Sequence, residues 1–119
     1  MGHVNVKLRL ANPVKPDVGF VEGTALVDTG ATFTTIPKEI SKKLGLRPTG
    51  KRKVRTATQI ETLEQSFLSV EINGNVTVTP VLVSETLDKI LVGVITLEAL
   101  GLTVDPTKGE LKEAETYLL

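Results

Sequence analysis

The residues with the clearest capacity for chemistry are Asp28, Thr29 and Gly30, which directly follow the apolar run 25–27. A strand that ends in an acid, a hydroxyl and a glycine presents a carboxylate at a tight turn, where it can serve as a general acid or base. The triplet occurs once in the 119 residues. If Asp28 is catalytic, the chain therefore has to obtain a partner carboxylate from a second copy of itself.

The segments that would position this triplet are mostly strands. Alternating polar and apolar residues, or clusters of β-branched residues, predict extended structure at 4–10, 20–27, 32–36, 51–58, 62–72, 76–82 and 89–92. Asn73-Gly74 predicts a tight hairpin, and Gly23 is a candidate bulge. Short helices are expected at 37–44 and 96–100, each followed by a glycine that suits a helix end.

A weak internal repeat links the two halves of the chain. The first half has an apolar strand, the Asp28 triplet, a helix and Leu44-Gly45-Leu46. The second half has the apolar residues 90–92, then Gly93, a helix and Leu100-Gly101-Leu102. The repeat predicts a mostly-β domain with approximate internal two-fold symmetry.

The composition is typical of a globular protein. At this length we expect a single domain over residues 1–119. Fourteen basic and fourteen acidic residues cancel, so no net field favours nucleic acid or a membrane as a partner. The chain has no cysteine, which removes disulfides and thiolate metal sites. Neither a signal peptide nor an apolar run of about 20 residues is expected, and these features together suggest a cytoplasmic location.

Three segments together make the sequence similar to a known family: 25–32 (ALVDTGAT), 90–102 (ILVGVITLEALGL) and 103–111 (TVDPTKGEL). The sequence resembles the retroviral-type, or retropepsin-like, aspartic proteases, in particular their cellular relatives in bacteria and archaea, over roughly residues 4–111. The resemblance implies a closed, barrel-like, mostly-β fold with one or two short helices that forms a homodimer. It also implies an aspartic endopeptidase whose partners are a second copy of the chain and a polypeptide substrate, with no cofactor and no metal.

The resemblance assigns roles to the triplet and to other residues. Asp28 of each subunit would share one proton and activate a water molecule that attacks the peptide carbonyl. Thr29 would hydrogen-bond across the dyad to the other subunit, and Gly30 would let the substrate backbone pass close by. Substrate-binding positions are expected beside the triplet, after the second glycine and at the tip of a flap: Ala31, Thr32, Val94, Thr58, Gln59 and Ile60.

A β-hairpin flap is expected at about residues 53–63, as a lid over the cleft. Family flaps usually carry glycine near the tip, and this segment has none. The alternative function is therefore a catalytically weak relative that serves as a peptide-binding or dimerisation module. Retroviral members carry an acidic residue and an arginine where Thr32 and Val94 stand here, which is consistent with a cellular branch.

Simpler interpretations stay open for several residues. Asp28 could be only a turn residue, and DTGAT also matches a phosphate loop of sugar kinases and actin-like ATPases, which need a much larger body. Gly93 is expected to allow close packing beneath the Asp28 loop and to have no part in the chemistry. The basic residues 47, 51–53 and 55 favour a solvated face at the flap base over a nucleic-acid site, because the net charge is zero.

The two ends of the chain carry weaker signals. His3 is the only histidine, and one imidazole near a terminus is no metal site. The tail, about 112–119, ends in Tyr117-Leu118-Leu119. Two interpretations stay open for these three residues: a frayed end, or a strand at the dimer interface, which the resemblance implies and which we favour.

Overall fold

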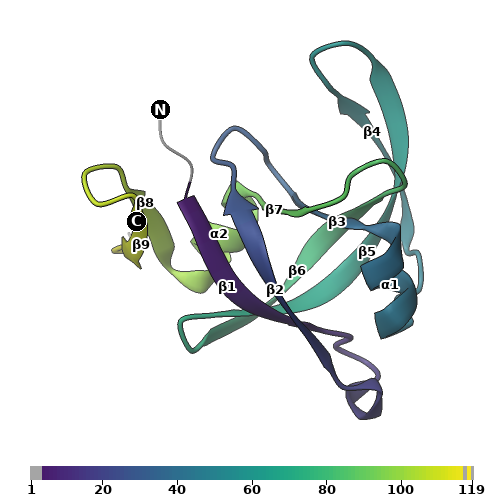
Figure 1. Ribbon diagram of the computed structural model, residues 1–119, viewed down its shortest axis with the longest axis horizontal. Coiled ribbons are helices and arrows are strands. Elements are labelled where there is room, and N and C mark those ends of the chain that lie inside the picture. Colours follow the sequence, from purple (N-terminus) through teal and green to yellow (C-terminus); the bar gives the residue numbers. More distant parts are fainter. Residues whose placement is uncertain (1–3, 117, 119) are drawn as a thin grey trace.

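The computed structural model describes residues 4–116 and 118, and its dominant feature is a closed β-barrel (Figure 1). The strands are β1 (Val4–Ala11), β2 (Phe20–Val27), β3 (Thr34–Pro37), β4 (Gly50–Arg55), β5 (Ile60–Ile72), β6 (Asn75–Ser84), β7 (Ile90–Val92), β8 (Leu102–Asp105) and β9 (Glu110–Glu113). The barrel closes in the order β1-β2-β7-β3-β6-β5, because β1 pairs with both β2 and β5. The helices are α1 (Lys38–Leu44), α2 (Val94–Leu100) and the 3-10 helix η1 (Pro16–Val18). The expected mostly-β barrel with two short helices is confirmed.

The barrel interior is filled by the inward faces of the strands, as the alternation of the sequence predicts. In β5, for example, Leu68, Val70 and Ile72 are buried, while the residues between them are half exposed. Both α1 and α2 add apolar side chains to this core, which anchors them to the barrel. No helix in the described part of the chain is long and apolar enough to cross a membrane. The buried core consists of Val4, Leu8, Leu10, Ala25, Val27, Ile36, Leu44, Leu68, Val70, Ile72, Val81, Val83, Ile90, Val92, Leu97, Leu100 and Leu102.

Strand β7 determines the course of the loop that carries the Asp28 triplet. It pairs in parallel with β2 and antiparallel with β3, so it lies between two strands that are consecutive in the chain. The connection 28–33 between β2 and β3 must therefore pass over the carboxyl end of β7. That end is where Gly93 follows the strand.

The predicted turns and helix ends are confirmed, and one predicted bulge is wrong. Asn73 and Gly74 have φ values of 53° and 82°, as a two-residue hairpin of type I′ requires. The glycine after each helix adopts the left-handed conformation that ends a helix. At Gly23, however, the β1–β2 register continues without a bulge. A Cβ there would lie 3.2 Å from Ile90 Cδ1, so this glycine leaves room for a neighbouring side chain.

Two hairpins of the described chain flank the Asp28 loop in the view of Figure 1. One joins β4 to β5 and carries the predicted flap, and the other joins β8 to β9 as a separate two-stranded sheet. The strand expected at 51–58 is shorter than predicted, because β4 ends at Arg55 and the turn occupies 56–59. Helix α2 begins at Val94 and not at Thr96, because its first N–H groups bind the Asp28 loop.

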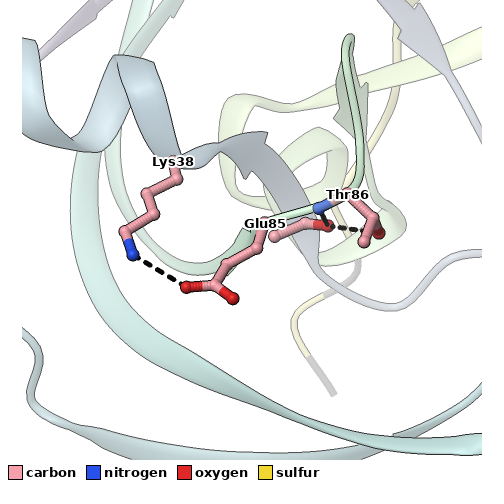
Figure 2. A network of polar contacts seen from close by, with 4 residues as sticks. Lys38, Glu85 and Thr86 are labelled. Carbon is pink, nitrogen blue, oxygen red and sulfur yellow. Dashed lines mark hydrogen bonds and ion pairs between the residues drawn. The ribbon is translucent and has the colours of Figure 1, made fainter.

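An ion pair at the surface connects the start of α1 to the segment that follows β6 (Figure 2). Lys38 Nζ lies 2.7 Å from Glu85 Oε1. Beside it, the Thr86 N–H donates to Ser84 Oγ at 3.2 Å, which shapes the turn that presents the glutamate. The hydrogen bond and the charge of Glu85 raise the pKa of Lys38, and those of Lys38 lower the pKa of Glu85.

Candidate active site

The Asp28 loop is a backbone turn held at the end of β7. The Asp28 N–H donates to the Val92 carbonyl oxygen at 2.9 Å, and the Ala31 N–H donates to the Asp28 carbonyl oxygen at 3.0 Å. The carboxylate oxygen Oδ1 accepts a hydrogen bond from the Gly30 N–H at 3.0 Å. Asp28 therefore does serve as a turn residue. A carboxylate can accept several hydrogen bonds, however, and this half-exposed one keeps capacity for chemistry.

The segment that follows β7 supports the loop from beneath. The first two N–H groups of α2, at Val94 and Ile95, donate to carbonyl oxygens of the loop at 2.8 and 3.1 Å. These contacts require the two backbones to touch. A Cβ on Gly93 would lie 2.5 Å from the carbonyl carbon of Phe33, a separation at which one backbone would have to move. The predicted packing role of Gly93 is confirmed.

Buried threonine hydroxyls tie this region to the barrel. Thr34 Oγ1 accepts from the Gly93 N–H at 3.1 Å and lies 2.6 Å from Thr96 Oγ1. Thr96 Oγ1 in turn lies 3.3 Å from Thr79 Oγ1, and all three side chains are buried. Leaving one such group unpaired costs about 1–3 kcal/mol, so the network holds β3, β6 and α2 in one arrangement. The sequence gives no signal for it, since these threonines are far apart in the chain.

A cleft of about 570 Å³ opens beside Asp28, between its loop and β4. Of the predicted site residues, Asp28, Gly30, Ala31 and Thr32 line it. Lys53, Val54 and Arg55 of the predicted flap also line it. The remaining lining residues were not predicted from the sequence: Phe33, Thr35, Arg52 and Leu82. Since β4 is the first strand of the predicted flap, the structure brings the carboxylate and the flap strand together in one cleft.

The tip of the β4–β5 hairpin forms without glycine. The Thr56 N–H donates to the Gln59 carbonyl oxygen at 2.8 Å, and Thr56 Oγ1 accepts from the Thr58 and Gln59 N–H groups at 3.3 and 3.1 Å. A threonine hydroxyl can take the place of a backbone acceptor in a turn, and no residue from 56 to 59 has a positive φ. The predicted contacts Thr58, Gln59 and Ile60 are exposed and do not line the Asp28 cleft, so their role stays a prediction.

Thr29 lines a second cavity, of about 790 Å³, toward α2 and β8. Val94 and Leu97 of α2 and Val104 of β8 are among its other lining residues. The structure thus brings Val94 together with Thr29 and not into the cleft that Asp28 lines. The predicted contact of Val94 with substrate stays a prediction.

The remaining predicted features lie at the surface or outside the described residues. The basic side chains at positions 47, 51–53 and 55 are exposed, as expected for a solvated face. Over residues 4–116 and 118, no group of His, Cys, Asp or Glu side chains is placed to hold a metal ion. The predicted interface strand falls on Tyr117 and Leu119, which lie outside the described residues, as does His3.

Known proteins match the chain both in sequence and in fold. The family model for the gag-polyprotein putative aspartyl protease matches residues 18–110, a span that includes the Asp28 loop, the β4–β5 hairpin and α2. The fold is similar to that of the simian foamy virus (mac) protease in solution, with a TM-score of 0.59 and 19% identity over 79% of this chain and 91% of the viral one. No curated protein matches the sequence. The chain belongs to the gag-polyprotein aspartyl protease family and has the barrel fold of the retropepsin-like aspartic proteases.

Proposed function

We propose that the protein is an aspartic endopeptidase in which Asp28 from each of two copies activates the water that hydrolyses a peptide bond. The observation that carries this proposal is the position of Asp28, whose half-exposed carboxylate lines a cleft next to the first strand of a flap-like hairpin. Membership of the aspartyl protease family supports peptide hydrolysis in general. The proposal goes beyond family membership in two respects: the pairing of two Asp28 carboxylates and the dimer that brings them together.

The proposed chemistry needs two carboxyl groups in different protonation states. Two such groups held close together share one proton, because like charges at short distance disfavour double ionisation. The ionised Asp28 takes a proton from the attacking water, while its protonated partner donates a hydrogen bond to the peptide carbonyl. A proton then passes to the leaving amine and the two roles exchange. Their titration belongs to the pair and not to either residue alone.

A second copy of the chain is proposed as the source of the partner carboxylate. Asp28 is the one acidic residue among the described residues that line the cleft. Thr29 is exposed on the side of α2 and β8, and we assign it the hydrogen bond between subunits. Gly30 is assigned to the passage of the substrate backbone. A Cβ on Gly30 would lie only 3.3 Å from Asp28 Oδ1, so glycine keeps the approach to the carboxylate open.

Substrate contacts are proposed on both walls of the cleft. Ala31 and Thr32 line its floor beside the triplet, and the exposed flap tip would reach the peptide when the hairpin closes. We also propose membership of a cellular branch of the family, because Thr32 and Val94 replace the charged residues of retroviral members. Thr56 closes the glycine-free tip. The alternative of a catalytically weak peptide-binding or dimerisation module predicts no peptide hydrolysis.

Asp28→Asn tests the proposal, because it keeps an oxygen that can accept the Gly30 N–H but removes the acid and base. We expect hydrolysis of a dye-labelled unfolded protein to fall by about 10³-fold or more. Asp17→Asn is the matched control, since Asp17 lies in η1 and does not line the cleft, and it should retain wild-type activity. A rate for Asp28→Asn equal to the wild-type rate would rule out the proposed mechanism.

A further inference from the structure

The cleft beside Asp28 carries an excess of positive charge. Its lining includes three cations from β4, namely Arg52, Lys53 and Arg55, against the single acid Asp28. The ion pairs of the described residues lie elsewhere, so no described carboxylate comes within 4.0 Å of these cations. A concave site lined by one sign of charge attracts ligands of the opposite sign.

Two acidic side chains of the same hairpin, Glu61 and Glu64, line a different cavity. There, Lys51 is accompanied by Glu61 and Glu64 of β5 and by Glu85. The two cavities thus differ in charge: the glutamates Glu61 and Glu64 line the other cavity, and the cations Arg52, Lys53 and Arg55 line the cleft. Lys51 and Arg52 are consecutive and both exposed, yet they have opposite electrostatic surroundings.

Arg52 is the cleft cation whose position is best defined. Its Cζ lies 4.5 Å from the centroid of the Phe33 ring, and its Nε donates to Gln65 Oε1 at 2.9 Å. A guanidinium group has five N–H donors in one rigid plane, so its two terminal nitrogens can still bind a carboxylate side by side. Because Phe33 belongs to the loop that begins at Asp28, the stacked arginine is held beside the proposed catalytic turn.

We propose that the cleft selects peptides with an acidic side chain near the scissile bond, and that Arg52 is the specificity-determining residue that binds it. This inference rests on the proposed peptide-binding function and names its substrate class. Phe33 and Gln65 hold the guanidinium in place, so little side-chain freedom is lost when the peptide binds. Lys53 and Arg55 add a longer-range attraction, which salt screens. Arg52 also offsets the repulsion between a substrate carboxylate and Asp28.

The test uses short peptides that are uncharged except for one Glu moved from position to position, each paired with its Gln version. At the best position we expect kcat/KM to be about tenfold higher for Glu than for Gln, with a ratio that declines as salt is added. Arg52→Glu should bring the ratio below one and favour the matching Lys peptide. Lys51→Glu is the control, because it makes the same change in net charge one residue away, and its ratio should equal that of the wild type.

Two results would overturn the inference: equal rates for Glu and Gln at every position, or a loss of preference in Lys51→Glu as large as in Arg52→Glu. Binding of the same peptides to Asp28→Asn protein, followed by calorimetry, separates this inference from the proposed hydrolysis. If the wild type cleaves nothing but the variant binds Glu peptides about tenfold more tightly, hydrolysis is wrong and acidic selection stands. If the wild type cleaves the peptides but does not distinguish Glu from Gln, hydrolysis stands and acidic selection is wrong. If the wild type cleaves nothing and the variant does not distinguish Glu from Gln, hydrolysis and acidic selection are both wrong.

Discussion

At the scale of single residues, Asp28 and Gly93 form one structural unit although they are far apart in the chain. Asp28 is positioned by backbone contacts with the end of β7 and the start of α2. Those contacts exist because Gly93 has no side chain. Its φ of −92° and ψ of 173° are accessible to any residue, so the requirement for glycine is purely steric.

Gly93→Ala should therefore destabilise the protein by placing a methyl group against the backbone of Phe33. We expect the free energy of unfolding in urea to fall by about 2–3 kcal/mol, together with proteolytic activity, as the Asp28 loop is displaced. Gly50→Ala is the control, since nothing lies within 4 Å of a Cβ at Gly50, and its effect should stay within about 0.5 kcal/mol. Equal effects of the two substitutions would contradict the steric role of Gly93.

Residue types and spacing identify Asp28 and Gly93 but not the side chains that surround them. The Asp28 triplet and the apolar run that ends in Gly93 are short patterns that a sequence displays directly. The buried contact of Thr34 with Thr96 and the stacking of Arg52 on Phe33 depend on how distant segments meet. No local pattern encodes such distances, so these contacts could be found only in the folded structure.

At the scale of elements, the β4–β5 hairpin forms its tip turn without a glycine residue. Turn types that require a positive φ usually have glycine there. This turn has no positive φ, and the Thr56 hydroxyl accepts hydrogen bonds from the Thr58 and Gln59 N–H groups. The loop thus stays in conformations open to ordinary residues. One exposed side chain therefore contributes hydrogen bonds that stabilise the turn at the tip of the hairpin.

Thr56→Ala should loosen this tip. Loss of one hydrogen-bond acceptor of about 1 kcal/mol should raise the hydrogen-exchange rate of the Gln59 amide about fivefold. Thr56→Ser keeps the hydroxyl and should exchange like the wild type. An unchanged rate in Thr56→Ala would show that the hydroxyl does not hold the turn.

The ion pair between α1 and the segment after β6 predicts a pH dependence (Figure 2). Lys38 lowers the pKa of Glu85 below its ordinary value of 4.5, and Glu85 raises that of Lys38 above 10.5. The stabilisation is therefore present between these two pH values and is lost as the pH falls through the lowered pKa of Glu85 or rises through the raised pKa of Lys38. The Tm of Glu85→Gln should lie slightly below that of the wild type at neutral pH and match it in acid. A difference that persists in strong acid would exclude the ion pair as its cause.

Helices and strands could be predicted where a short stretch of sequence carries a clear hydrophobic or turn pattern. Alternation identifies the long strands, and Asn73-Gly74 identifies the hairpin between β5 and β6. Helix α2 starts two residues earlier than its pattern indicates. The N–H groups of Val94 and Ile95 donate hydrogen bonds to the Asp28 loop, and these bonds hold the two β-branched residues in the first turn of the helix. Strand β9 is polar and almost fully exposed, so it has no hydrophobic pattern and becomes a strand only by pairing with β8.

At the scale of the whole molecule, the closed barrel brings the loop that carries Asp28 to one end, where the proposed partner chain would add its own Asp28. The loop between β2 and β3 crosses β7 at one end of the barrel, between the β4–β5 hairpin and the β8–β9 sheet (Figure 1). The internal repeat supplies a support for this loop through Gly93 and not a second acid. At this end, one chain thus presents the Asp28 carboxylate, the flap-like β4–β5 hairpin and a second cavity lined by Thr29.

The central claim, that catalysis needs Asp28 from two chains, is tested most directly by mixing wild-type and Asp28→Asn protein under conditions that allow subunits to exchange. If both carboxylates are required, activity follows the fraction of dimers with two intact chains. At equal amounts we expect about one quarter of the activity of the same total concentration of wild type, as random pairing in a two-fold dimer gives. Activity proportional to the wild-type content, about one half in the same mixture, would contradict the claim.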